Sequence, residues 1–245
     1  MDIAGKTALI TGGAHRVGKA ITIALAEAGA NVVINYYSSD VAARETAAEA
    51  RALGVDALAV QADVGDIDEA RSLVSAAAER FGSVDILVNS ASIWRKTPLP
   101  MGDFSDWRRV LSVLLDGPMA LSDAVAPMMI ERGAGAIVNI VDLSAWKPFR
   151  GFIAHSVGKA GLLALTRQLA VELAPHVSVN AVAPGPVLPP PDYSRDQAYA
   201  IAGRTLKGRW GTPDDVASAV RFLVEADYIT GEVIVVDGGE RLASA

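Results

Sequence analysis

Three ionisable side chains, Asp142, His155 and Lys159, have types and spacing that could move a proton. His155 and Lys159 are four positions apart in a stretch that favours a helix, and residues at this spacing share one helix face. Asp142 precedes His155 by 13 positions and directly follows an apolar run. A nearby carboxylate favours the imidazolium form of histidine, which can donate a proton. The alternative for Asp142 is a capping or turn residue after a strand.

Glycines gather earlier in the chain, in Thr11-Gly12-Gly13-Ala14-His15-Arg16-Val17-Gly18. Glycine lets the backbone turn tightly and approach a pyrophosphate, and a helix that begins near Arg16 would aim free N–H groups at that anion. The spacing differs from the six-residue GxGxxG fingerprint, so an ordinary strand-to-helix turn is the alternative. We expect a nucleotide site here, with His15 close to the cofactor phosphates.

The next apolar run ends in Asn35-Tyr36-Tyr37-Ser38-Ser39. An NAD site usually places an acid here for the ribose 2′-hydroxyl, but none comes before Asp40, which we expect to cap a helix. Arg16 offers a planar guanidinium suited to a 2′-phosphate, and Ser38 and Ser39 add hydroxyl groups. The pattern therefore favours NADP(H); an exposed helix-start arginine is the alternative for Arg16.

Short apolar runs alternate with helical stretches along the whole chain, which predicts an α/β fold: a single doubly wound domain over residues 1–245, with a seven-stranded, mainly parallel sheet between helices. Predicted helices include Asp40–Leu53, followed by Gly54, and Asp66–Phe81, ended by Gly82. The predicted strands are Thr7–Thr11, Asn31–Asn35, Ala57–Gln61, Ile86–Asn89, Ala136–Val141, Ser178–Ala183 and Glu232–Val236.

A proline-rich stretch, residues 184–213, interrupts this alternation after the sixth strand, with a short helix predicted over Asp196–Arg204. Ligands of open α/β sheets bind at the carboxyl ends of the strands, and long loops in compact domains are usually functional. We therefore expect a substrate lid that includes Tyr193; a plain surface loop is the alternative.

Composition narrows the class of protein. The formal net charge is −6 and no basic face is evident, which argues against a nucleic-acid binder. There is no cysteine, the histidines form no metal-ligand cluster, and no secretory signal is visible, so we expect a cytoplasmic protein without a metal. The mean hydropathy of +0.30 fits buried parallel strands, packed helices or a large subunit interface, and no uncharged run reads as a membrane span.

These motifs together resemble the short-chain dehydrogenases/reductases, a Rossmann-fold family, over nearly the whole length. Further matches are Asp63-Val64, Asn89-Ser90-Ala91-Ser92, Val179-Asn180, Pro184-Gly185 and Ile229-Thr230-Gly231 with Asp237-Gly238-Gly239. The resemblance implies that Asp63 holds the adenine and that Lys159 binds the nicotinamide ribose. The cofactor contacts expected in this way are Gly12, Arg16, Val17, Gly18, Tyr36, Ser38, Ser39, Asp63, Val64, Asn89, Ala91, Lys159, Pro184, Gly185 and Val187.

The catalytic pattern departs from that family. Lys159 matches, but His155 occupies the position of the family's tyrosine, Asp142 that of its serine and Leu114 that of its asparagine. Asp142 and Arg16 resemble the pteridine reductase branch, and Trp94 falls where that branch stacks a phenylalanine on the pterin. For Trp94, a hydrophobic wall residue is the alternative.

Three functions remain open. The first is an NADPH-dependent reductase of a C=N or C=O bond in a flat small molecule, in which Asp142 and His155 deliver the proton. The second resembles the 3-oxoacyl-carrier-protein reductases, with Arg195, Arg204, Lys207 and Arg209 as the surface for the acyl carrier. The third is an NADPH-binding sensor that has lost the proton step, and a changed, non-redox chemistry also remains.

The family resemblance also implies a twofold-symmetric homotetramer, built through the helix that carries Lys159 and through the last strand. Apolar residues on that helix extend beyond one face: Leu162, Leu163, Leu165, Leu169 and Val171. The tail Leu242-Ala243-Ser244-Ala245 is short and uncharged.

Overall fold

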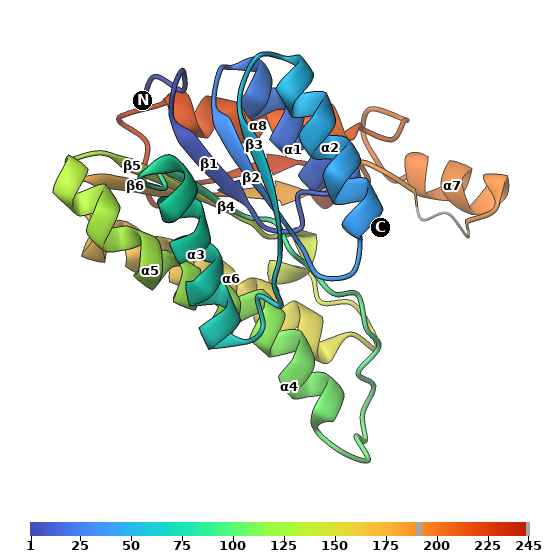
Figure 1. The fold of residues 1–245 in the computed structure, drawn as a ribbon. Helices are drawn as coiled ribbons and strands as arrows, with labels where there is room; N and C mark the ends of the chain where they lie inside the picture. Colours follow the sequence, from blue (N-terminus) through green and yellow to red (C-terminus); the bar gives the residue numbers. More distant parts are fainter. Residues whose placement is uncertain (190–192, 244–245) are drawn as a thin grey trace.

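A seven-stranded parallel sheet forms the centre of the computed structural model, which describes residues 1–189 and 193–243 (Figure 1). The strand order is β3-β2-β1-β4-β5-β6-β7, so the chain reverses direction across the sheet between β1 and β4. All seven predicted strands and the doubly wound order are confirmed, with ends within one residue. The strands are β1 (Thr7–Ile10), β2 (Asn31–Tyr36), β3 (Ala57–Gln61), β4 (Ile86–Asn89), β5 (Gly135–Ile140), β6 (Val177–Pro184) and β7 (Val233–Val236).

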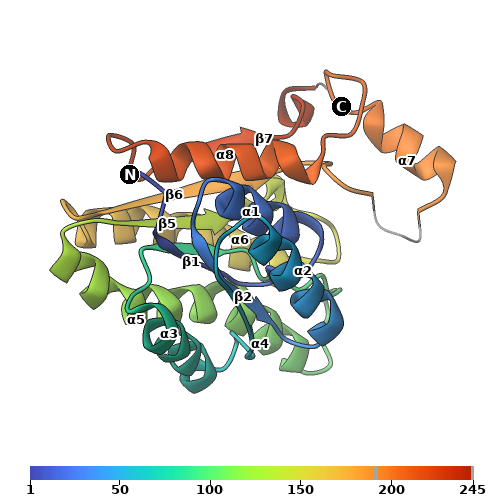
Figure 2. The same ribbon diagram turned by 45° about the horizontal axis from the view of Figure 1, so that its top comes forward.

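Helices cover both faces of the sheet, as the continuous apolarity of the strands requires (Figures 1 and 2). One face carries α1 (Arg16–Glu27), α2 (Asp40–Ala52) and α8 (Pro213–Glu225). The other carries α3 (Ile67–Phe81), α5 (Gly117–Arg132) and α6 (Ile153–Glu172). Each face has its own buried aliphatic cluster, and the carboxyl ends of the strands are left for the site.

One helical stretch, Ser105–Arg132, is long and apolar enough by composition to cross a membrane, but 56% of its most apolar window is buried in the fold. It consists of α4 (Ser105–Leu111), a π-helical turn η1 (Ser112–Asp116) and α5. Leu114 lies fully buried in the π turn and contacts the position of Gly158 on α6. A π turn within a helix often marks a functional site, and here it brings α4 beside the residues of α6.

The predicted helix ends are right in all but one respect. Asp66 caps α3 by accepting from the N–H groups of Asp68 and Glu69, and Gly82 ends it at φ 83°. Gly54, at φ 93°, follows α2 as predicted. The cap assigned to Asp40 is wrong, because this residue is the first of α2 and its carboxylate instead accepts from the Tyr36 hydroxyl at 2.8 Å.

The proline-rich segment leaves the sheet after β6, and its described part around α7 forms an arm that stands off the body (Figure 2); its role as a substrate lid stays a prediction. Its helix, α7 (Arg195–Ala202), begins with a capping box between Ser194 and Gln197, close to the predicted range. Pro190 and Pro191 lie outside the described residues. The end of the arm is tied to the turn after β7, because the Lys207 N–H donates to the Gly238 carbonyl at 3.1 Å.

The apolar residues of α6 serve the chain's own core more than the sequence suggested. Leu162, Leu163 and Leu169 are buried against the sheet, so they were wrongly counted as cover for a subunit interface. Val171 is 73% exposed, and Val157 is exposed on the same helix.

Candidate active site

The glycine turn after β1 borders a cavity of about 570 Å³ at the carboxyl edge of the sheet. A methyl group on Gly18 would lie 2.1 Å from the Gly12 carbonyl oxygen, and one on Gly12 would lie 3.1 Å from the Ala91 Cα. Ten of the predicted cofactor residues line this cavity: Gly12, Arg16, Val17, Gly18, Tyr36, Ser38, Ser39, Asp63, Val64 and Ala91.

Backbone contacts hold this turn in place. The Thr11 hydroxyl accepts from the N–H groups of Ser90 and Ala91, each at 2.9 Å, which ties the turn to the end of β4. The Gly13 N–H donates to the Asn35 carbonyl at 3.1 Å. His15 precedes α1, and no side chain from the described residues caps the first turn of that helix. Its free N–H groups and its dipole therefore suit an anion such as a pyrophosphate, so the cavity fits a dinucleotide.

Arg16 has a left-handed backbone, with φ 55°, which is strained for a side chain other than glycine. Its guanidinium donates to the Leu188 carbonyl at 3.3 Å, at the start of the proline-rich segment. The predicted contact of Arg16 with a 2′-phosphate stays a prediction, and the observed bond shows that Arg16 also links the glycine turn to the chain after β6.

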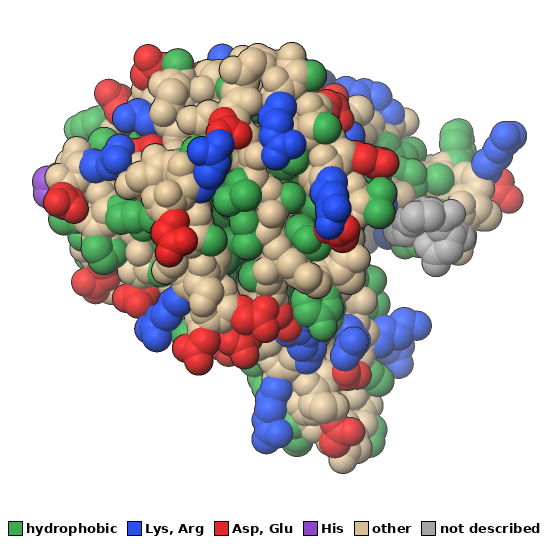
Figure 3. Space-filling view, viewed as in Figure 1, with side chains coloured by type: hydrophobic (Ala, Val, Ile, Leu, Met, Phe, Trp, Pro, Cys, Tyr) green, Lys and Arg blue, Asp and Glu red, His purple; other side chains and the backbone are tan. Residues whose placement is uncertain are grey.

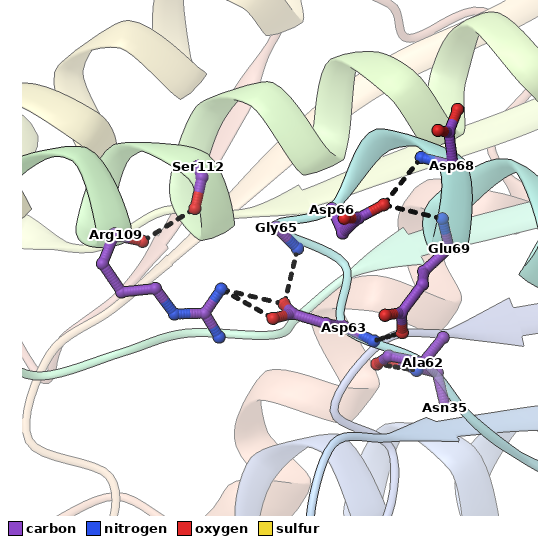
Figure 4. A network of polar contacts seen from close by, with 9 residues as sticks. All are labelled: Asn35, Ala62, Asp63, Gly65, Asp66, Asp68, Glu69, Arg109 and Ser112. Atoms are coloured by element: carbon purple, nitrogen blue, oxygen red, sulfur yellow. Dashed lines mark hydrogen bonds and ion pairs between the residues drawn. The ribbon is translucent and has the colours of Figure 1, made fainter.

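The end of the cavity next to β3 is built around the carboxylate of Asp63 (Figure 4). Arg109, which reaches over from α4, approaches the Asp63 Oδ2 at 2.8 Å, and the Gly65 N–H donates to Oδ1 at 2.9 Å. The Arg109 guanidinium also lies over the Tyr37 ring, 5.5 Å from its centroid. Asp63 is therefore oriented by α4, and Tyr37 and Arg109 flank the place where the sequence puts the adenine.

A second network lies at the end of β2. The Tyr36 hydroxyl donates to Asp40, and Arg44 pairs with the same carboxylate at 3.0 Å. The hydrogen bond from Tyr36 and the pairing with Arg44 outweigh a small effect of burial and lower the pKa of Asp40. The first acid after β2 is thus already engaged by two donors, and Ser38 and Ser39 line the cavity.

The structure brings Asp142 and His155 together, with 2.7 Å between Oδ2 and Nε2. The other ring nitrogen, Nδ1, lies 3.2 Å from the Ile93 carbonyl oxygen. Both partners are hydrogen-bond acceptors, and only the doubly protonated imidazolium donates from both nitrogens. The His155 side chain is 2% exposed against 24% for Asp142, so the carboxyl group is the more exposed member of the pair.

Asp142 is also a cap, so the two roles left open by the sequence coexist. Its Oδ1 accepts from the N–H of Ser144 at 2.8 Å and from the Ser144 hydroxyl, at the start of the 3-10 turn η2 (Leu143–Ala145). Burial acts to raise the pKa of Asp142, but the hydrogen bond from His155, the charge of Lys159 and the bond from Ser144 outweigh it and lower the pKa. The carboxylate is therefore the stable form in this setting.

Lys159 lies on the same face of α6 as His155 and is buried. Its ammonium donates to the Ile140 carbonyl at 2.7 Å. Burial lowers the pKa of Lys159, and the charge of Asp142 offsets part of that effect. The Lys159 side chain is thus held at the end of β5. Its acceptor, Ile140, precedes Asp142 by two residues.

An aromatic cluster adjoins the pair. Trp94 stacks on Phe152, with centroids 4.2 Å apart, and meets the His155 ring edge-on at 4.5 Å. Phe149 contacts Trp94 at 5.8 Å in a T-shaped arrangement. The Thr97 hydroxyl accepts from the Ala154 N–H and so joins this loop to α6. Trp94 remains 59% exposed, so one aromatic surface stays open beside Asp142.

The other predicted residues lie around this core. Asn89 is buried beneath the cavity and donates to Asn139 on the next strand at 2.8 Å. A methyl group on Gly185 would lie 2.7 Å from the Asp237 Cβ, which explains the glycine after β6. Val187 is buried in the core, and Tyr193 is 39% exposed on the arm without lining any of the cavities described here.

Comparison with known proteins identifies the family to which this fold and site belong. A family model described as enoyl-(acyl carrier protein) reductase matches residues 12–240. The 3-oxoacyl-[acyl-carrier-protein] reductase of Synechocystis sp. is 38% identical over 242 residues, 97% of each chain. The protein belongs to the short-chain dehydrogenase/reductase family.

Solved structures of this oxidoreductase family agree over nearly the full length. FolM Alternative dihydrofolate reductase 1 from Brucella canis, complexed with NADP, is 34% identical, has a TM-score of 0.93, and matches over 100% of this chain and 97% of its own. Acetoin dehydrogenase YohF from Salmonella typhimurium is 32% identical, with a TM-score of 0.90 over 98% of each chain. The first neighbour confirms the expectation that such a site takes NADP(H), and the two names show that related chains act on different substrates.

Several residues of the site escaped the sequence analysis. Phe149 and Phe152 are more than 50 positions from Trp94 and carry no local signal, because their contact depends on how two loops meet. Arg109 likewise reaches Asp63 from 46 positions away. Ser144 was detectable, since a serine two residues after an aspartate at a strand end is typical of an Asx turn.

Proposed function

We propose that this protein is an NADPH-dependent reductase of the pteridine-reductase-like kind, which reduces a C=N or C=O bond in a flat small molecule. The observation that carries the proposal is the hydrogen-bonded pair of Asp142 and His155 beside the exposed ring of Trp94. A buried proton store, a half-open carboxyl group and an aromatic surface are what protonation of a stacked heteroaromatic ring needs.

Different residues along the cavity would bind different parts of the cofactor. The free N–H groups of α1 and the glycine turn take the pyrophosphate, and Asp63, oriented by Arg109, takes the adenine. Arg16, Ser38 and Ser39 take the 2′-phosphate, and Lys159 takes the nicotinamide ribose. When bound, NADPH supplies the hydride.

The proton comes from the other side of the substrate. In the proposed step, the Nε2 proton of the His155 imidazolium moves to Oδ2 of the Asp142 carboxylate and from there to the substrate nitrogen or oxygen, so Asp142 ends as the carboxylate that it was at the start. His155 ends neutral, still donating from Nδ1 to the Ile93 carbonyl, and is recharged from solvent through Asp142. His155 is too buried to touch the substrate, so it acts as the proton store and Asp142 as the group that makes contact.

A C=N bond suits this site better than a ketone. A ring nitrogen is basic enough to take the proton before reduction, which lowers the demand on a pair whose carboxyl group has a lowered pKa. Leu114, in the π turn of the α4–α5 stretch, offers no polar atom to hold a water beside Lys159, so a proton path through that lysine has no support.

A substrate panel tests the proposal. NADPH oxidation is measured at 340 nm with 7,8-dihydropterins, cyclic imines, simple ketones and acetoacetyl thioesters. We expect the highest kcat/KM with a dihydropterin or a cyclic imine. Tight NADPH binding with no oxidation across the panel would instead support a sensor, and a preference for the thioesters would support the second candidate.

That second candidate is a 3-oxoacyl-carrier-protein-reductase-like enzyme. It is favoured by the relative from Synechocystis sp. and by the family model, both of which carry acyl-carrier-protein reductase names. The cations that would meet the acidic carrier lie on and after α7 and are all exposed: Arg195, Arg204, Lys207 and Arg209. Acetoacetyl thioesters of the carrier protein and of a small thiol, compared directly, separate carrier recognition from simple ketone reduction.

We further propose, from the family resemblance, that the protein works in the cytoplasm as a homotetramer. Val157 and Val171 are the exposed apolar residues of α6 that such an interface would cover. Light scattering at micromolar concentration should give about four times the subunit mass of 25.5 kDa; a mass near a single subunit contradicts the assembly.

A further inference from the structure

A cavity of about 820 Å³ opens next to the catalytic pair, between the 3-10 turn after β5, the end of the α7 arm and the C-terminal turn η3 (Glu240–Leu242). Leu143, the residue after Asp142, lines it on one side together with Trp146 and Phe149. Phe149 also contacts Trp94, so this cavity adjoins the aromatic cluster directly. Its size is that of a small-molecule site, and the proposed reduction uses none of its polar groups.

The charges around this cavity are unbalanced. Among the described residues, Lys147, Arg204 and Arg241 line it, against a single lining carboxylate from Glu240. None of the three cations takes part in an ion pair or a side-chain hydrogen bond among the described residues. The chain as a whole carries a net charge of −6, so a cationic cavity beside the site is a local exception that favours an anion.

Glu240 does not neutralise this charge in a specific contact. Burial raises the pKa of Glu240; the charges of Arg204 and Lys147 oppose that rise, and the charge of the Asp237 carboxylate adds to it. Those two cations therefore act on the same small region from two different segments. An anionic ligand group in that region would meet the same attraction.

The cations are carried by segments that are fixed to each other. The Asp237 carboxylate accepts from the N–H groups of Gly239 and Arg241, which sets the turn after β7. The Thr205 side chain lies 3.3 Å from where a methyl group on Gly238 would be, so the chain just after Arg204 packs on that turn. The arrangement is thus a formed wall of the fold, with the cations projecting from its two halves.

We propose that this cavity binds an anionic group of the substrate, a carboxylate or a phosphate, at the end of the molecule away from the ring that is reduced. The inference rests on the proposed function and deepens it, because it narrows the substrate to a flat ring that carries an acidic tail. Guanidinium groups pair with planar carboxylates and with phosphates alike, and the indole of Trp146 offers a surface for the linker between ring and tail.

The kinetic test compares substrates that differ in the tail. 7,8-Dihydrofolate carries two carboxylates, 6-methyl-7,8-dihydropterin has the same ring without them, and acetoacetyl-coenzyme A brings phosphates. With NADPH saturating, Arg204→Gln and Arg241→Gln should each raise the KM for dihydrofolate about tenfold, with kcat nearly unchanged. The KM for the methylpterin should stay within about twofold, because it makes no contact with the cations.

The controls separate a specific site from general charge. Arg150→Gln removes an exposed cation of the same loop as Lys147 that does not line the cavity, and it should leave both KM values within about twofold. Added salt should raise the KM for dihydrofolate in the parent and much less in the Arg204→Gln, Arg241→Gln double variant. The Kd of NADPH should be unchanged in all variants; a weaker cofactor complex would assign the cations to the cofactor and overturn the proposal.

A binding measurement keeps this inference apart from the proposed reaction. Folate and 6-methylpterin are titrated calorimetrically into protein saturated with NADP⁺, which has no hydride to give. Tighter binding of folate that is lost in the double variant supports the anion site even if nothing in the panel is reduced. Equal affinity and equal kcat/KM for tailed and untailed rings overturn the anion site while the reductase stands. A response to acetoacetyl-coenzyme A alone identifies the anion as a phosphate.

Discussion

The two ends of the site are built in different ways. At the cofactor end the backbone does most of the positioning, through the glycine turn, the Thr11 hydroxyl and the start of α1. At the proton end side chains from three distant segments meet: Trp94 after β4, Asp142 after β5 and His155 on α6. A backbone cradle tolerates few sequences, whereas a side-chain cluster can be rebuilt for a new reaction without disturbing the fold.

Exposure separates the two ends as well. The Asp63–Arg109 pair is only partly buried, and each partner orients the other at the rim of a wide cavity. At the proton end, the whole residue His155 is 1% exposed and the whole residue Lys159 is 3% exposed. Figure 3 shows the molecule hollowed between the α7 arm and the lobe that carries α4, at the carboxyl edge of the sheet. Solvent therefore screens the charges at the proton end less than those at the cofactor end. We expect substitutions at the proton end to change kcat more than the Kd for NADPH.

From this comparison we expect the largest effect on cofactor binding when the glycine turn itself is changed. Gly18→Ala places a methyl group 2.1 Å from the Gly12 carbonyl oxygen, so the turn must open. We expect the Kd for NADPH to rise by at least about 100-fold and the free energy of unfolding to fall by about 1–3 kcal/mol. Fluorescence titration and chemical denaturation measure the two quantities.

The matched control for that variant is Gly102→Ala. Gly102 has free space around its Cβ position and no left-handed backbone, so an alanine there should change neither NADPH binding nor stability appreciably. If Gly18→Ala binds NADPH as the parent does, the cofactor end is not the rigid cradle described here.

The second prediction concerns the proton end. His155→Phe keeps the ring packed against Trp94 but removes both N–H groups, so Asp142 loses its proton store. We expect kcat to fall by about 10²–10⁴-fold with the best substrate of the panel, while the Kd for NADPH stays within about threefold. Steady-state rates at saturating NADPH, measured over a range of pH, show the size of the loss.

Companion variants sharpen this result. His155→Tyr should retain part of the activity, because its hydroxyl can still donate a proton to Asp142. Asp142→Asn should lower kcat as well, because an amide cannot take the proton from His155 and pass it to the substrate. Unchanged turnover in His155→Phe removes histidine from the mechanism and leaves Asp142 or the substrate as the proton source.

The contrast between the two ends also explains what the sequence could reveal. The strands, the glycine turn and the place of ten residues in one cavity were predictable, because each depends on local pattern: apolar runs, glycine spacing and an Asp-Val pair after β3. The Asp142–His155 contact was predictable from helix periodicity and the position of Asp142 after β5.

The predictions that were wrong or missing concern contacts between segments that are distant in the sequence. Asp40 was taken for a helix cap, but the hydroxyl of Tyr36 draws its carboxylate across to β2. The leucines of α6 were counted as a subunit interface, although the sheet of the same chain buries them. The cationic cavity was not foreseen as a whole, since Lys147, Arg204 and Arg241 are scattered over 95 positions of the sequence and share no pattern.

A third, smaller effect is expected at Arg16, in the glycine turn of the cofactor end. The parent should bind NADPH more tightly than NADH, and Arg16→Ala should erase most of that difference, about tenfold, through loss of a charged hydrogen bond to the 2′-phosphate. The variant also loses the contact with Leu188, so the control is NADH, whose Kd should change little. Equal affinities of the parent for the two cofactors contradict the assignment.

The smallest predicted effect is on stability, and it follows from the lowered pKa of Asp142. Burial works against the charged form of this carboxyl group, but His155, Lys159 and Ser144 together hold its pKa below the ordinary value. The carboxylate therefore stabilises the fold above the pKa of the unfolded chain, near 4, and this contribution is lost as pH falls through the lower pKa of the folded state. Asp142→Asn cannot ionise, so it lacks the contribution at every pH. We expect the variant to be less stable than the parent by about 1–2 kcal/mol at pH 6 and the gap to narrow progressively below pH 4, because the parent then loses what the variant never had. Denaturation curves for both proteins between pH 3 and pH 7 give the gap directly, and all other carboxylates cancel in the difference. A gap that is constant over that range means that the asparagine disturbs packing alone, and the charge at position 142 then contributes nothing to folding.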